Sequence, residues 1–178
     1  MTCIVGLIDK KTVYIGADSA GVGNLNLRVR KDLKVFKNGK FLMGCTTSFR
    51  MIQLLKYQFI PPKHPPSLST DKYMVTKFID AIRKCFKNGG FAKSENDEEK
   101  GGTWLVGYKG RLFRIEDDYQ VAENIFPFDS CGCGENYAMG SLYSTNGRIK
   151  DPQKRIILAL EAAQEFSAGV KGPFYIKT

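Results

Sequence analysis

The chain has 178 residues, 43% hydrophobic and 25% charged, a balance typical of one globular domain and unlike that of a disordered chain. Lys and Arg outnumber Asp and Glu by 27 to 18, and the resulting net charge of +9 permits an acidic or nucleic-acid partner without requiring one. Neither a membrane-spanning apolar run nor a secretory signal pattern is found, so we expect one cytoplasmic domain over residues 1–178.

Residues 2–46 predict a series of short strands. The apolar, β-branched stretches 2–8 and 12–17 flank a turn and form a hairpin. Residues 18–24 have the composition of a loop, and short strands are expected at 25–29 and 34–37. Asn38-Gly39 favours a tight turn, which would pair the strand at 34–37 with one at 41–46.

Two helices and a second group of strands follow. Residues 49–59 have helical spacing behind Ser48, a candidate N-cap, and prolines at 61–66 end that helix. The remaining elements are expected in this order: a helix at 69–87, an acidic loop at 88–101, strands at 103–108, 111–115 and 119–122, helices at 135–143 and 152–166, and a strand at 174–176.

This order of elements predicts the fold class. Strands and helices come in groups and do not alternate one by one, which favours an α+β fold with largely antiparallel sheets. Two helix pairs and two groups of strands predict a four-layer αββα sandwich.

The familiar catalytic and metal-binding patterns are poorly represented. The only histidine, His64, lies among prolines, a weak platform for the base of a Ser-His or Cys-His enzyme. Cys131-Gly-Cys133 lacks a second Cys or His pair, and no phosphate-binding glycine loop occurs. We therefore expect neither a metal centre nor a cofactor.

One hydrolytic chemistry needs no histidine. A threonine at the N-terminus carries its own base, because its α-amine can take the proton of its hydroxyl. Thr2 would become such a residue once Met1 is removed. The predicted hairpin brings Asp18 back toward Thr2, and the charge of Lys34 could lower the pKa of the hydroxyl. Residues 44–48 end a strand and open a helix, where free backbone N–H groups can bind an oxyanion.

Three short patterns then match a known family. Thr2-Cys-Ile-Val-Gly, Gly16-Ala-Asp-Ser and Lys34-Val-Phe followed by Gly44 resemble the β subunits of the proteasome and the bacterial peptidase HslV, which are N-terminal-nucleophile (Ntn) hydrolases. The resemblance extends over nearly the whole chain and is strongest over residues 2–48. It implies the Ntn type of αββα sandwich, peptides or unfolded proteins as substrates, a homo-oligomeric ring and an ATP-dependent unfoldase as a possible partner.

The resemblance also implies a role for each residue of a candidate site. Thr2 would be the nucleophile with its freed α-amine as base. Asp18 would orient that amine and balance its charge, and Lys34 would lower the pKa of the Thr2 hydroxyl. The backbone N–H of Ser48 would form the oxyanion hole.

Two further positions match the family less closely. Cys133 stands in the turn 132–134 where the family places a serine next to the nucleophile, and Glu165 stands where it has an aspartate. Both would support the nucleophile from nearby.

Two alternatives to a threonine peptidase remain open. The first is a catalytically silent protein of the same fold with a structural or interaction role. The second is a basic nucleic-acid-binding module that uses the six cations of residues 28–40, although no aromatic side chains interleave them in the manner of such modules, which makes nucleic acid the weaker hypothesis.

Overall fold

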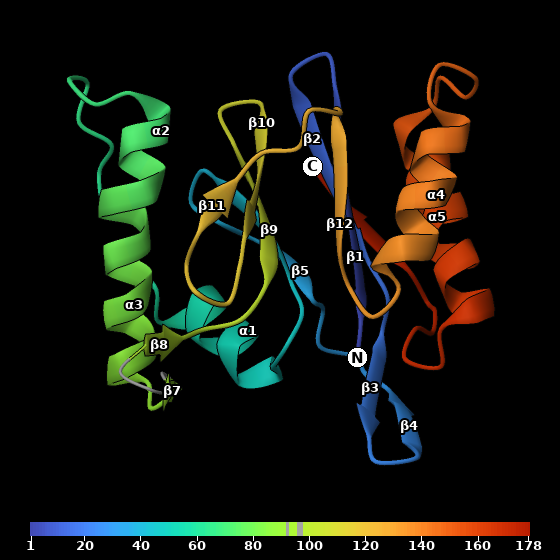
Figure 1. Cartoon of the computed structure of the whole chain (residues 1–178), viewed down its shortest axis with the longest axis horizontal. Coiled ribbons are helices and arrows are strands. Elements are labelled where there is room, and N and C mark those ends of the chain that lie inside the picture. Colours follow the sequence, from blue (N-terminus) through green and yellow to red (C-terminus); the bar gives the residue numbers. More distant parts are fainter. Residues whose placement is uncertain (92, 96–97) are drawn as a thin grey trace.

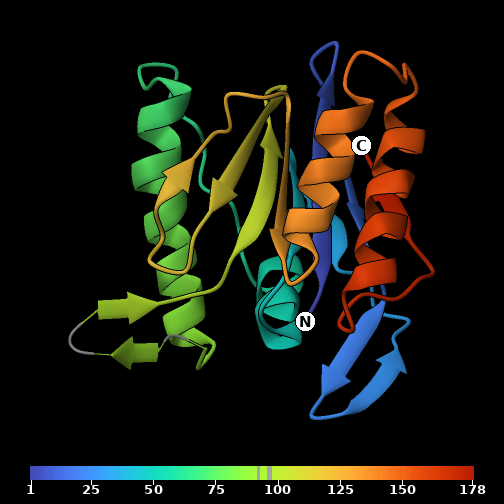
Figure 2. The ribbon, with the colours of Figure 1, turned by 45° about the vertical axis from the view of Figure 1, so that its right-hand side comes forward.

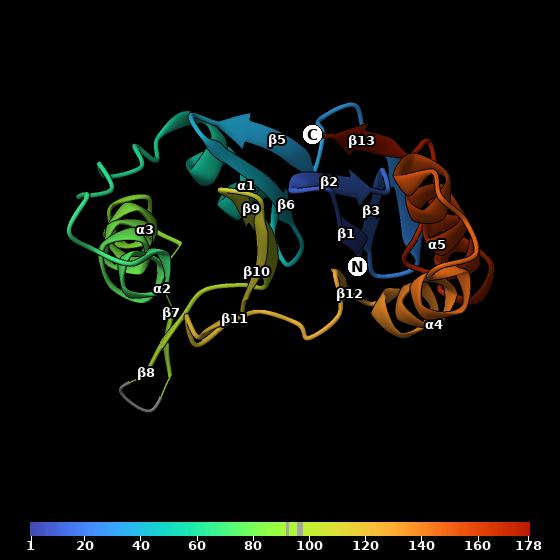
Figure 3. The ribbon, with the colours of Figure 1, turned by 90° about the horizontal axis from the view of Figure 1, so that it is seen from above.

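Two antiparallel sheets stack face to face in the computed structural model, which describes residues 1–91, 93–95 and 98–178 (Figure 1). Helices cover the outer surface of each sheet, so that the layers run helix, sheet, sheet, helix when seen from above (Figure 3). The predicted α+β class and the four-layer αββα sandwich are confirmed.

The first sheet contains the N-terminal strand. Its order is β12–β1–β2–β13, and these strands span Phe128–Gly132, Cys3–Asp9, Thr12–Ala17 and Tyr175–Lys177. Helices α4 (Glu135–Thr145) and α5 (Pro152–Phe166) cover its outer face. Asp151 caps α5 as predicted, because its carboxylate accepts from the N–H groups of Gln153 and Lys154.

The second sheet has the order β11–β10–β9–β6–β5. These strands span Val121–Ala122, Arg111–Ile115, Trp104–Tyr108, Phe41–Cys45 and Val35–Asn38. Its outer face packs on α1 (Phe49–Tyr57) and on one long helix whose parts are α2 (Thr70–Tyr73), a π-helical segment η1 (Met74–Phe78) and α3 (Ile79–Asn88). The helix predicted at 69–87 is therefore present, with a π-helical middle that its spacing did not reveal.

Two small hairpins stand outside the sandwich. Strands β3 (Ala20–Gly23) and β4 (Asn26–Val29) pair with each other and project from the end that holds the N-terminus (Figure 2). Strands β7 (Lys93–Glu95) and β8 (Glu98–Lys100) form the second hairpin. The expected loops at 18–24 and 88–101 are thus wrong in part, because each contains paired strands; residues 92, 96 and 97 of the second loop lie outside the described residues.

Strand β12 is the strand of the two main sheets that the sequence analysis did not predict. It pairs with β1 along its full length, with Cys3 opposite Gly132 and Leu7 opposite Phe128. Its segment carries Asp129 and Ser130, two polar residues that weaken the apolar pattern of a buried strand. The structure buries both, and the Ser130 hydroxyl donates to the Ile4 carbonyl at 2.8 Å.

The two sheets approach each other closely at Gly44. A Cβ atom placed on this glycine of β6 would lie 2.5 Å from Cγ2 of Ile15 and 2.6 Å from Cγ2 of Ile4. Both isoleucines are fully buried between the sheets and have little rotamer freedom. A glycine at this position therefore sets the spacing of the sandwich.

We predict that Gly44→Ala lowers stability by about 1–3 kcal/mol, the usual cost of overpacking a filled core. Thermal unfolding followed by circular dichroism measures the effect as a fall in Tm. Gly23→Ala is the matched control, because a Cβ atom there meets no atom within 4 Å. Equal Tm values for both variants would contradict the close approach.

Candidate active site

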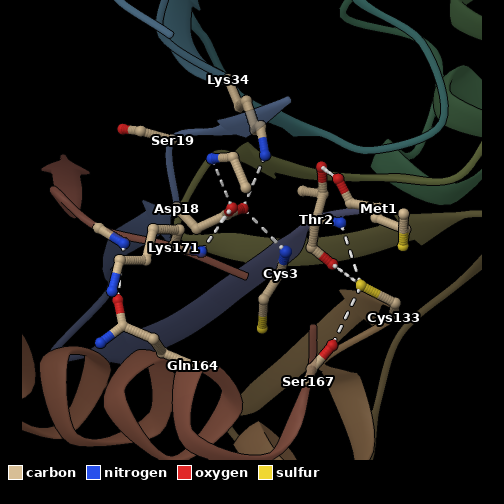
Figure 4. A network of polar contacts seen from close by, with 12 residues as sticks. Met1, Thr2, Cys3, Asp18, Ser19, Lys34, Cys133, Gln164, Ser167 and Lys171 are labelled. Atoms are coloured by element: carbon tan, nitrogen blue, oxygen red, sulfur yellow. Dashed lines mark hydrogen bonds and ion pairs between the residues drawn. The ribbon is translucent and has the colours of Figure 1, made fainter. Parts of the chain in front are cut away.

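The candidate site lies where several strand ends meet at one end of the sandwich (Figure 4). Thr2 precedes β1, Asp18 follows β2, and Lys34 precedes β5. Ser48 follows β6 and begins α1, and Cys133 follows β12. Antiparallel pairing within each sheet accounts for this meeting, since the start of one strand lies beside the end of its neighbour.

The centre of the site is a buried ion pair between Asp18 and Lys34. Lys34 Nζ lies 2.8 Å from Asp18 Oδ1, and the two side chains are 1% and 0% exposed. Burial lowers the pKa of Lys34 from its ordinary value, whereas the negative charge of Asp18 opposes that shift.

Backbone groups complete the surroundings of the Asp18 carboxylate. Oδ1 also accepts from the N–H of Cys3 at 2.9 Å, and Oδ2 accepts from those of Ala20 at 2.8 Å and Lys171 at 3.3 Å. The carboxylate therefore has four donors, and the Cys3 contact places it one residue along the chain from Thr2.

Thr2 is 5% exposed and lies beside Cys133. Its N–H donates to the Cys133 sulfur at 3.2 Å, and the Cys133 thiol donates to the Thr2 carbonyl at 3.4 Å. The Thr2 hydroxyl donates to the carbonyl of Met1 at 2.5 Å. Gly132 permits this approach, because its φ is +104° and a Cβ atom there would lie 2.3 Å from the Thr2 carbonyl oxygen.

Glu165 lies outside this network. It is exposed in the last turn of α5, and no described residue of the site contacts it. The residue that contacts Cys133 from this region is Ser167, whose hydroxyl lies 3.3 Å from the sulfur. Ser167 stands just beyond the end of the helix, and the sequence analysis did not select it.

Ser48 has one predicted feature and one unexpected feature. Its hydroxyl accepts from the N–H of Arg50 at 3.1 Å, so the predicted N-cap of α1 is confirmed. Its own N–H was expected to be free but donates to the Thr46 carbonyl at 2.6 Å. The cause is a tight turn in which Thr47 has a φ of +55°, a conformation rare for a threonine.

A small cavity of about 80 Å³ opens at the candidate site. Thr2, Lys34 and Ser48 line it together with Met1, Val22 and Phe49. Three of the predicted residues thus share one cavity, and Asp18 and Cys133 contact its walls from behind.

Comparison with known proteins relates this geometry to solved structures. No protein-family model and no curated protein matches the sequence. BPH from Thiobacillus denitrificans, solved in complex with epoxomicin, aligns with a TM-score of 0.81 at 18% identity over 98% of this chain and 96% of its own. HslV from Trypanosoma brucei aligns with a TM-score of 0.70 at 13% identity over 98% and 97%. A Gly-1 mutant of Anbu from Hyphomicrobium sp. strain MC1 aligns with a TM-score of 0.70 at 18% sequence identity. The alignment covers 99% of this chain and 80% of the Anbu chain.

The chain has the HslV-type fold. Sequence identities of 13–18% to these structures establish the fold alone. The roles of individual residues must therefore be argued from the geometry of this chain.

The six cations of residues 28–40 do not form one basic face on this HslV-type fold. Lys34 is buried against Asp18, and the Arg30 guanidinium pairs with Asp32. Lys37 and Lys40 lie at the tip of the β5–β6 hairpin, at the opposite end of the strand from Lys34. This dispersal does not favour nucleic-acid binding, which requires clustered cations.

His64 holds the proline-rich segment against the helical layer. Its ring stacks on Tyr73 at a centroid distance of 4.3 Å, and its two nitrogens contact the Tyr108 hydroxyl and the Leu68 carbonyl at 3.0 and 2.9 Å. The structure thus gives this histidine a packing role away from Thr2. Among the described residues, no group of three His, Cys, Asp or Glu side chains could hold a metal ion, and no helix is long and apolar enough to cross a membrane.

We predict that Lys34→Ala lowers stability by about 3–5 kcal/mol, because it leaves the buried Asp18 carboxylate without its counter-charge. Chemical denaturation of parent and variant gives the change directly. Lys37→Ala removes the same charge from an exposed position three residues away and should cost less than about 0.5 kcal/mol. Similar losses for both variants would show that Lys34 does not depend on its buried pair.

Proposed function

We propose that this protein is a threonine-type peptidase that uses Thr2 as an N-terminal nucleophile after the removal of Met1. The observation that carries the proposal is that Thr2 shares a cavity with Lys34, whose charge is held in a buried pair with Asp18. The solved structures of the same fold include HslV and a protein bound to epoxomicin, which adds support.

Removal of Met1 is the first requirement. While Met1 is attached, the Thr2 nitrogen belongs to an amide and cannot accept a proton. Met1 is 53% exposed, whereas Thr2 on the other side of the bond is 5% exposed. The freed α-amine has a pKa near ~7.7–8.0 in model peptides, which leaves roughly 10–20% of it as free base at pH 7 and a larger share at slightly higher pH.

Each residue then has a part in the reaction. The Thr2 hydroxyl oxygen attacks the carbonyl carbon of a substrate peptide bond while the α-amine takes its proton. The positive charge of Lys34 favours the developing alkoxide. The N–H of Ser48 exchanges its bond with Thr46 for one to the tetrahedral oxyanion. The amine returns the proton to the leaving nitrogen, and water hydrolyses the resulting ester to regenerate Thr2.

Cys133 and Ser167 would position the amine. The sulfur of Cys133 already accepts the N–H of Thr2 and lies within contact of the Ser167 hydroxyl. After Met1 is lost, the same sulfur faces the amine and can orient one of its hydrogens. Sulfur is a weak acceptor, so this contact serves orientation more than charge balance.

Assembly into a ring is the second part of the proposal. Leu27 and Val29, which share one face of β4, are 46% and 55% exposed in the single chain. Leu25, at the tip of the same hairpin, is fully exposed. An apolar hairpin of this kind is stabilised by contact with another surface. We assign that surface to a second copy of the chain in a homo-oligomeric ring, as the family resemblance implies, with an ATP-dependent unfoldase as a possible further partner.

The role of Thr2 is tested by mass spectrometry and hydrolysis of a fluorogenic peptide. We expect the purified protein to lack one methionine residue. Thr2→Ala should lose at least about 10³-fold in kcat, because it removes the nucleophile, and Thr2→Ser should keep partial activity. Epoxomicin should inhibit the parent protein.

Thr12→Ala is the control for this experiment, since Thr12 is exposed at the far end of β2 and should not affect kcat. Hydrolysis by Thr2→Ala within about tenfold of the parent would reject the assignment. A protein that retains Met1 and hydrolyses nothing would instead support the catalytically silent alternative.

The ring is tested by light scattering coupled to size exclusion. We expect a closed assembly of six or seven subunits per ring, more readily as two stacked rings, and its formation should strengthen as salt screens the +9 charge of each subunit. Leu27→Lys should weaken assembly, whereas Ile125→Lys, at a more exposed apolar position away from β4, should not. A 20.0 kDa monomer at ~150 mM salt would exclude the ring.

A further inference from the structure

A second hollow adjoins the cavity at Thr2. Its volume is about 360 Å³, and it lies between the β3–β4 hairpin and the start of α1. Val22 and Phe49 line both this hollow and the cavity of Thr2, so the two lie next to each other. A peptide held at Thr2 would therefore pass along the hollow, and we call it the arginine groove because Arg28 and Arg30 line it.

Arg30 is held rigidly in the arginine groove. Its guanidinium carbon lies 3.7 Å from the centre of the Phe49 ring, and its stem fills the space left by Gly21, where a Cβ atom would lie 2.7 Å from Arg30 Cδ. Its Nε and Nη2 donate to the Asp32 carboxylate at 2.8 and 2.6 Å. These contacts use one edge of the guanidinium and leave Nη1 without a hydrogen-bond partner among the described residues.

Arg28 supplies the charge that is not balanced. It lies opposite Gly21 in the register of the β3–β4 hairpin, its side chain is exposed, and it makes no ion pair with the described residues. The lining of the groove contains no carboxylate, and Asp32 beside it is already occupied by Arg30. The groove therefore has two guanidinium groups and one neighbouring carboxylate, a surplus of one positive charge.

We propose that the arginine groove binds an acidic side chain of the substrate, so that the enzyme selects peptides with Glu or Asp close to the bond that is cut. A carboxylate matches the surplus charge and can accept from Arg28 and from the open edge of Arg30 together. The Phe49 ring beneath Arg30 limits the access of water and holds the guanidinium in place. This inference rests on the proposed function, because that function makes a peptide the substrate. The binding of the peptide does not itself require hydrolysis.

Hydrolysis of matched peptides tests the selectivity. Each set of three peptides differs only in having Glu, Gln or Lys at one position. Separate sets place that position at each residue flanking the cleaved bond. At one position we expect kcat/KM for the Glu peptide to exceed that for the Gln peptide by about five- to tenfold, with the Lys peptide lowest. Arg28→Gln should bring the Glu and Gln peptides within about twofold of each other, and Arg28→Glu should reverse the order of Glu and Lys.

Arg148→Gln is the matched control, because it removes the same charge from an exposed position in the loop between α4 and α5. It should keep the preference of the parent. Equal hydrolysis of the three peptides at every position by the parent protein would overturn the proposed role of the arginine groove and leave the peptidase assignment intact.

A binding measurement separates the groove from the reaction. Fluorescence anisotropy of labelled Glu and Gln peptides is recorded with the Thr2→Ala variant, with and without Arg28→Gln. Tighter binding of the Glu peptide that disappears with Arg28→Gln supports the groove even if the parent protein hydrolyses no peptide, in which case only the proposed function fails. Equal binding of the two peptides contradicts the proposal that the arginine groove binds an acidic side chain.

Discussion

The buried carboxylate of Asp18 is the group on which the arrangement of the candidate site depends. Its four donors come from β1, β3, the segment before β13 and the lysine before β5. A carboxylate without such donors would be costly to bury, so each donor segment is held in place by the need to satisfy the charge. The pair with Lys34 therefore fixes the positions of Thr2 and Lys34 relative to each other and joins the two sheets at one end.

The register of β12 against β1 is the second constraint, because it places Cys133 beside Thr2. Strands and helices with a local signal were predictable: the hairpin at 38–39, the caps Ser48 and Asp151, and the apolar periodicity of the helices. Strand β12 has no such signal, since Asp129 and Ser130 are stabilised by partners distant in sequence. Arg114 of β10 donates to the Ser130 carbonyl at 2.7 Å, and only the tertiary fold brings that side chain there.

The candidate site likewise combines features that a local sequence pattern predicts with features that depend on tertiary contacts. The hairpin predicted at 2–17 was sufficient to bring Asp18 back toward Thr2. The place of Lys34 was indicated by the family resemblance, because the β3–β4 hairpin lies between it and Asp18 and their buried ion pair is a tertiary contact. Glu165 was expected near the nucleophile, but the residue from this region that contacts Cys133 is Ser167, since that contact depends on the residue at which α5 ends. The pairing of the Ser48 N–H depends on the left-handed conformation of Thr47, which no residue preference indicates.

The hydrogen bonds around Met1 suggest how the chain with Met1 attached differs from the proposed enzyme. The Thr2 hydroxyl donates to the Met1 carbonyl, and the Ser48 N–H donates to the Thr46 carbonyl, so the proposed nucleophile and oxyanion donor are both satisfied within the chain. Loss of Met1 removes the acceptor of the Thr2 hydroxyl and converts the adjacent amide into a basic amine in the same step. Neither the ion pair of Asp18 with Lys34 nor the contact of the Cys133 sulfur with Ser167 involves Met1. One peptide bond would therefore separate a blocked threonine from one with its own base, while the Ser48 N–H would still have to leave the Thr46 carbonyl to bind an oxyanion.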